Sequence, residues 1–272
     1  MSLQPPKLCV YCGTGKPSKE HIFGDWMKDH VQTNETRTVH HTSYMGLDQG
    51  IVPTVGFRPK LNREGAPHRV QLKIACEKCN SGWMNHLQDN AKPLLIELIN
   101  ARWPIISEDH LGHLARWATM VTMSLEFADL KTVTTTADDR LAFKEHAVNN
   151  PPYNWQVYLG LGGDAWSTGA FWHRSLLVFD GNATNAIGKR PNMQVTTFHI
   201  GRSFFHTISG PADMTPNPEL YAFDLGIKQI WPLPVVVPQA PTILLNLGVA
   251  RASTKFFIDA GIDARPHQGL IL

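Results

Sequence analysis

Four cysteines stand in two C-x-x-C pairs, and this spacing constrains the fold of the chain more than any other feature. The pairs are Cys9–Cys12 in "LCVYCG" and Cys76–Cys79 in "ACEKCN", and the chain of 272 residues contains no other cysteine. Two tight turns of this kind can place four thiolates around one Zn²⁺ ion in a closed tetrahedral site. Two disulfides, or unrelated buried thiols, are the alternatives. We expect one structural zinc per chain.

The composition is that of a soluble globular protein. Apolar residues make up 43% of the chain, and no apolar run approaches the roughly 18 residues that suggest a membrane span. The N-terminal stretch "MSLQPPKLCV" lacks the apolar segment of a signal peptide. We therefore expect a cytoplasmic protein with no membrane partner. In that compartment paired cysteines bind metal more often than they form disulfides.

Positive charge is concentrated in the N-terminal part of the chain. Residues 1–92 contain 12 Lys and Arg against 8 Asp and Glu, whereas the remaining residues contain 13 against 15. This excess allows a polyanion as partner without requiring one. A set of basic residues just before the second cysteine pair can grip a phosphate backbone, with a solvated charged surface as the alternative. The set comprises Arg58, Lys60, Arg63, Arg69 and Lys73.

The chain divides near residue 92 into a zinc-stapled module, residues 1–92, and an α+β domain of unknown role, residues 93–272. Helices are expected over about 93–150. Pro93 suits the first position of a helix through "PLLIELINARW", and Ser107 can cap a second helix that runs through residues 110–130. A third helix is expected over residues 137–148.

After residue 152 the pattern favours strands. Residues 153–161, 169–180, 193–201 and 203–210 are rich in aromatic and β-branched residues and are bounded by turn residues. We expect a short helical segment that leads into an antiparallel sheet. This region carries no catalytic motif, so it could orient DNA, sense a ligand, form a homo-oligomer or bind a regulatory partner.

The second cysteine pair runs directly into a helical pattern. Asn80, Trp83, Met84 and Leu87 follow at spacings that share one helix face. Asn80 is therefore expected to point inward. Trp83 could stack on a base, but its place beside Met84 favours core packing.

An acidic residue and a histidine, Glu20 and His21, follow the first cysteine pair at the point where a hairpin should return. Closing a zinc site between the two pairs brings this hairpin against the helix, and so brings both side chains toward Asn80. A turn at each end with a helix after the second is treble-clef topology.

The order C-x-x-C, acidic residue and His, then C-x-x-C-Asn resembles the HNH endonucleases with a ββα-metal core. It is most similar to their four-cysteine branch, which phage recombination endonuclease VII typifies. The string "EHIFGDWM … CEKCNSGWMNHL" is also similar to bacterial and phage HNH-type proteins of this length. The resemblance covers about residues 7–92. It implies metal-dependent hydrolysis of phosphodiester bonds, with DNA as the expected substrate and RNA as the alternative.

Carried over by position, the resemblance assigns His21 as general base, and Glu20 and Asn80 as ligands of a catalytic Mg²⁺ or Mn²⁺. The four cysteines match the structural zinc ligands. Glu20 departs from the aspartate of the branch but still offers a hard oxygen ligand. Asn62, and after it Asn34, is the candidate for the middle residue of the HNH motif. The alternative is a catalytically decayed zinc-binding module that binds nucleic acid or protein.

The other histidines receive structural or surface interpretations. His86 lies six residues after Asn80, about 240° around a helix, so it is expected to be solvated, with a phosphate contact as the alternative. His40 and His41 fall in an expected strand over residues 36–44 and are placed on the surface. His199 and His206 are expected to be structural polar residues of the sheet.

Overall fold

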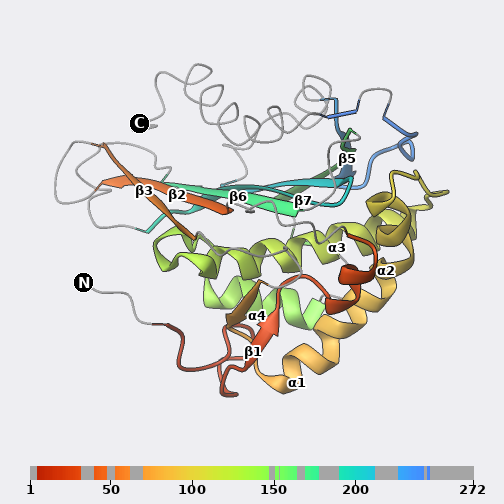
Figure 1. Ribbon diagram of the computed structural model, residues 1–272. Coiled ribbons are helices and arrows are strands. Elements are labelled where there is room, and N and C mark those ends of the chain that lie inside the picture. Colours follow the sequence, from red (N-terminus) through yellow and green to blue (C-terminus); the bar gives the residue numbers. More distant parts are fainter. Residues whose placement is uncertain are drawn as a thin grey trace.

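The computed structural model describes residues 5–31, 40–47, 53–61, 70–146, 151–152, 154–163, 169–177, 190–211, 226–241 and 244–245. For residues 40–47 and 53–61 the backbone alone is described. The structure is α+β, with the helices gathered on one face of a large sheet (Figure 1). No helix in the described part of the chain has the length and apolarity that a bilayer crossing requires.

Two short strands and a helical run carry the cysteine pairs. β1, Lys19–His21, pairs antiparallel with β4, Gln71–Lys73. A 3₁₀ turn, η1, follows β1 over Asp25–Asp29. The second cysteine pair opens a helical run of three parts: α1, Glu77–Cys79, the π turn η3, Asn80–Met84, and α2, Asn85–Ile99. The predicted helix after the second pair is present. The strand that carries Glu20 and His21 does not return in a hairpin of the first pair but pairs with β4, just before the second pair.

Among the described residues, seven strands form one sheet in the order β3-β2-β6-β7-β8-β5-β9. Neighbouring strands pair antiparallel except β2 and β6, which are parallel. β5 to β8 coincide with the four predicted strands, and β2 begins within the predicted strand over residues 36–44. The bounds are β2 His40–Leu47, β3 Pro53–Leu61, β5 Trp155–Leu161, β6 Gly169–Leu176, β7 Met193–Ile200, β8 Ser203–Ser209 and β9 Lys228–Trp231.

The central helix α3, Glu108–Leu125, lies between the sheet and the cysteine-bearing segments (Figure 1). Ser107 caps it as predicted, because its side chain accepts a hydrogen bond from the backbone N–H of His110 at 3.3 Å. The helix ends at Leu125, earlier than predicted, and continues as the short 3₁₀ turns η4, Glu126–Ala128, and η5, Leu130–Thr132. The apolar stripe of the helix is buried in full: Leu111, Leu114, Ala118, Val121 and Leu125.

The prediction that Pro93 begins a helix is wrong. Pro93 lies inside α2, which starts eight residues earlier at Asn85. A proline inside a helix leaves the carbonyl four residues before it without an N–H partner. Pro93 and Asp89 are both exposed, so water can satisfy that carbonyl. The helix thus runs through the predicted division at residue 92, and β2 and β3, from the N-terminal side of that division, join the large sheet.

Aromatic side chains join α3 to the sheet and to the segment after β1. The Trp117 ring packs edge-on against Phe198 and Phe205, with centroids 5.8 and 5.2 Å away. Phe23, two residues after His21, lies 5.8 Å from Phe198. All four side chains are almost fully buried. The segment that leaves β1 is therefore fixed to the same core as the sheet.

Three histidines of the sheet are buried and hydrogen-bonded. His206 contacts the Thr197 hydroxyl at 2.7 Å, and His199 contacts the Gly201 carbonyl at 3.2 Å. The structural role predicted for these two is confirmed. His173, which the sequence analysis did not single out, lies between the Thr196 hydroxyl and the Thr132 carbonyl. Burial lowers the pKa of His173 and His199 to about 4 and that of His206 to about 3.

These depressed pKa values predict loss of stability in mild acid. An unfolded histidine titrates near 6.5, so between about pH 6.5 and 4 the unfolded chain binds more protons than the folded one. The free energy of unfolding should therefore fall with decreasing pH, by up to about 1.4 kcal/mol per pH unit for each histidine. Urea unfolding of His206→Gln should show a shallower pH dependence than the wild type. Parallel curves for the two proteins would contradict this account.

Candidate metal centre and active site

Each cysteine pair sits in a tight backbone turn. In the first, the Gly13 N–H donates to the Cys9 carbonyl at 2.9 Å, and the Cys9 N–H donates to the Gly15 carbonyl at 2.7 Å. Gly13 has a φ of 70°, a conformation that favours glycine. In the second, the Asn80 N–H donates to the Cys76 carbonyl at 2.9 Å as the helical run begins.

Backbone hydrogen bonds also join the two turns to each other. The Val10 N–H donates to the Ile74 carbonyl at 2.9 Å, and the Ser18 N–H donates to the Ala75 carbonyl at 3.0 Å. Gly15 lies so close to the second turn that a Cβ there would be 2.5 Å from the Cys76 Cβ. The two turns are therefore held face to face by backbone contacts.

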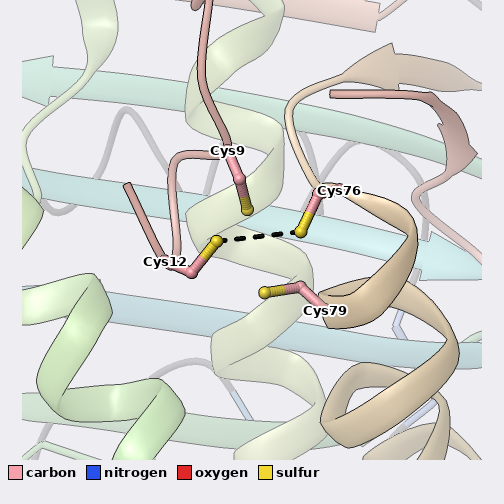
Figure 2. A group of neighbouring side chains, drawn as sticks. All are labelled: Cys9, Cys12, Cys76 and Cys79. Atoms are coloured by element: carbon pink, nitrogen blue, oxygen red, sulfur yellow. Dashed lines mark hydrogen bonds between the residues drawn. The ribbon is translucent and has the colours of Figure 1, made fainter. Parts of the chain in front are cut away.

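The four sulfur atoms point toward one another (Figure 2) and all lie within 4.8 Å of each other. Cys12 and Cys76 Sγ are 3.7 Å apart, far beyond disulfide bonding distance, and all four cysteines are free. A tetrahedral ion with Zn–S bonds of about 2.3 Å places its sulfur ligands about 3.8 Å apart. The cluster is thus close enough to hold a metal ion, as the spacing predicted.

The pKa values of three of the cluster's thiols are shifted, and not all in the same direction. Burial raises the pKa of Cys76 and of Cys79. Burial acts in the same direction on Cys12, but hydrogen bonds from the Thr14 hydroxyl and from the backbone of Gly15 and Thr14 outweigh it and lower its pKa to about 5. Four thiolates this close repel one another, so ionisation of all four requires a cation between them.

A polar cavity of about 150 Å³ lies beside the cluster. The predicted catalytic residues Glu20, His21 and Asn80 all line it, and all three are half-buried. The Asn80 Nδ2 donates to Glu20 Oε2 at 2.5 Å, and the Ser18 hydroxyl donates to the other oxygen of Glu20. The predicted approach of Glu20 and His21 to Asn80, across some sixty residues of sequence, is present in the structure.

The helix that carries Asn80 departs from ideal α geometry. Gly82, inside η3, has φ −92° and ψ −112°, which is not helical. Met84 and Leu87 are nevertheless buried, and Met84 lines the cavity with Asn80. Trp83 is partly buried, and its ring packs edge-on against Tyr11 at 5.1 Å. Its prediction as a core residue is confirmed.

Of the predicted basic cluster, only the side chain of Lys73 lies within the described residues. Arg58 and Lys60 lie on β3, at the edge of the large sheet, and their side chains are outside the described residues. Arg63 and Arg69 lie outside the described residues altogether, as do Asn62 and Asn34. Lys73 is exposed on β4, directly opposite Lys19 of β1.

Several cavity residues were not anticipated from the sequence. Asp25, Asn85 and Gln88 also line the cavity. Asn85 follows Asn80 by five residues, a spacing that an ideal α-helix places on different faces, and it reaches the cavity because the π turn η3 lies between them. His86 is exposed, as predicted, and its Nε2 lies 3.2 Å from Asn90 Nδ2. His40 and His41 lie on β2, and their side chains are outside the described residues.

The close approach of Gly15 to Cys76 yields a test of the metal centre. Gly15→Ala places a methyl group 2.5 Å from the Cys76 Cβ and 2.8 Å from its Sγ, so the two turns must separate. We expect this variant to lose bound metal and to unfold at a lower temperature.

Gly13→Ala is the matched control. Its added Cβ meets open space, and its cost is the conformational strain of a positive φ, about 1–2 kcal/mol. Elemental analysis after dialysis against a chelator should find metal in Gly13→Ala and not in Gly15→Ala. Equal metal retention in both variants would contradict the face-to-face packing of the turns.

Comparisons of this chain with protein-family models, with curated proteins and with solved structures found no match. The chemistry of the site therefore rests on the residues and contacts described above.

Proposed function

We propose that the protein is a metal-dependent endonuclease of the HNH, ββα-metal type that hydrolyses phosphodiester bonds in DNA. The observation that carries the proposal is the contact between Glu20 and Asn80 beside His21, in a cavity next to four clustered cysteines. In this interpretation β1, β4 and the helical run from Cys76 are the treble-clef core, and the cysteines bind one structural Zn²⁺.

The residues of the cavity suit a divalent ion. Glu20 offers carboxylate oxygens, and a 180° rotation of the Asn80 amide would present its oxygen in place of the nitrogen. Mg²⁺ and Mn²⁺ prefer such hard oxygen ligands. The ion, when bound, would neutralise charge on the scissile phosphate and on the departing 3′ oxygen.

His21 supplies the base that the reaction needs. The lone pair of a neutral imidazole can accept a proton from a water molecule. The resulting hydroxide attacks the phosphorus, and the bond from phosphorus to the 3′ oxygen breaks. The products are a 5′-phosphate and a 3′-hydroxyl end. Lys19 and Lys73 are paired across the two-stranded sheet of β1 and β4, and both can contact the phosphate backbone.

We expect His21→Ala to lower the rate of plasmid cleavage in Mg²⁺ or Mn²⁺ by about 100-fold or more, because it removes the proton acceptor. Zinc content and the fold should be retained, since His21 is half-buried and is not itself a member of the buried apolar cluster. The control is His86→Ala, which removes an exposed histidine outside the cavity and should cut normally. Cleavage by His21→Ala at near wild-type rate would show that another group is the base. A wild-type protein that binds nucleic acid but does not cut it would favour a catalytically decayed binding module.

We expect Asn80→Ala to raise the concentration of Mg²⁺ needed for half-maximal cleavage, because one of two oxygen ligands is lost while Glu20 remains. The rate at saturating Mg²⁺ should fall less than in His21→Ala. Titration of the cleavage rate with Mg²⁺ and with Mn²⁺ measures both effects. An unchanged metal requirement would remove Asn80 from the ligand set.

A further inference from the structure

The register of the two-stranded sheet of β1 and β4 places Gln71 directly opposite His21. The Gln71 side-chain nitrogen lies 2.9 Å from His21 Nε2. Gln71 is half-buried, and it is not among the residues that line the cavity, whereas His21 is. One ring nitrogen of His21 is therefore engaged across this strand pair, and Nδ1 is the nitrogen left for the cavity.

The partner of one ring nitrogen determines the protonation of the other. A neutral imidazole has one N–H and one free lone pair, and the hydrogen bond at one nitrogen selects between the two tautomers. The glutamine amide has an oxygen acceptor and a nitrogen donor of nearly the same shape, which a 180° rotation interchanges. With the oxygen toward Nε2, that nitrogen carries the proton and the lone pair of Nδ1 is free. With the nitrogen toward Nε2, Nδ1 is protonated and cannot accept a proton.

We propose that Gln71 is a positioning residue that accepts a hydrogen bond from His21 Nε2–H through its amide oxygen and so keeps Nδ1 free to take a proton from water. This inference rests on the proposed nuclease function of His21. When Nδ1 receives the proton, the ring carries two N–H groups and a positive charge. The bond from Nε2–H to Gln71 then becomes charge-assisted and stronger, so no side chain has to rearrange during the step.

Two substitutions distinguish a role of the hydrogen bond between Gln71 and His21 from a role of side-chain packing alone. Gln71→Met keeps the length of the side chain but cannot accept a comparable hydrogen bond, and Gln71→Glu keeps an acceptor oxygen. We expect Gln71→Met to lower kcat by about 10-fold or more with little change in KM, a loss typical of removed orienting partners. Gln71→Glu should restore the rate to within a few-fold of the wild type. The matched control is Asn90→Met, which breaks the analogous amide–imidazole contact of the exposed His86 and should leave cleavage unchanged.

A spectroscopic measurement tests the tautomer without relying on activity. Long-range ¹H–¹⁵N NMR spectra of the full-length protein, at a pH where histidine is neutral, distinguish Nε2–H from Nδ1–H, and the His21→Ala spectrum identifies the His21 signals. We expect the Nε2–H form in the wild type and in Gln71→Glu, and a mixture in Gln71→Met. An Nδ1–H form in the wild type, or wild-type kcat in Gln71→Met, would overturn the proposal. An Nε2–H form in a wild-type protein that cuts no nucleic acid would support the tautomer assignment and overturn the nuclease function.

Discussion

The meeting of the two cysteine turns is the constraint on which the rest of the site depends. Cys9 and Cys12 are joined to Cys76 and Cys79 by more than sixty residues of chain, and closing so long a loop costs conformational entropy. Backbone hydrogen bonds between the turns repay part of that cost, and a metal ion bound by all four sulfur atoms would add its binding free energy to the folded state. With the turns together, β1 lies against the helical run, and the Glu20 carboxylate accepts a hydrogen bond from the Asn80 amide.

The cysteine turns are also anchored to the remainder of the chain by hydrogen bonds. The Tyr11 hydroxyl lies 2.7 Å from that of Ser124 on α3. Arg140 lies on the helix α4, Ala137–His146. It donates to the Val10 carbonyl at 2.9 Å and to the Thr135 carbonyl at 2.6 Å. Buried Glu126, whose pKa burial raises, accepts hydrogen bonds from the threonines that precede α4. Polar groups buried in this way hold a specific geometry because an unpaired partner would be costly.

Local sequence spacing, together with the assumption that the two cysteine pairs meet around one metal ion, was enough to predict much of the site. The cysteine cluster, the Ser107 cap and the approach of Glu20 to Asn80 each depend on short sequence motifs. The continuation of α2 through Pro93 was missed because it depends on exposure of that turn to water, which local sequence does not reveal. The partner of His21 was missed for a different reason: the register of two three-residue strands, fifty residues apart, is set by the turns that flank them. The parallel pairing of β2 with β6 is likewise a tertiary contact without a local signal.

The volume of the cavity bears on the proposed nuclease function, because it limits which part of a nucleic acid could enter. Pockets that enclose a drug-sized ligand usually span about 300–1,000 Å³, whereas this cavity of about 150 Å³ suits an ion and part of a phosphate group. A base or a sugar would have to remain outside it. In the proposed nuclease, His21, Glu20 and Asn80 would therefore act on any phosphodiester that reaches them, without reading sequence. Selection of the substrate would then come from surfaces beyond the cavity, and the anchoring of the cysteine turns to α3 and α4 would hold these surfaces in a fixed relation to the cavity.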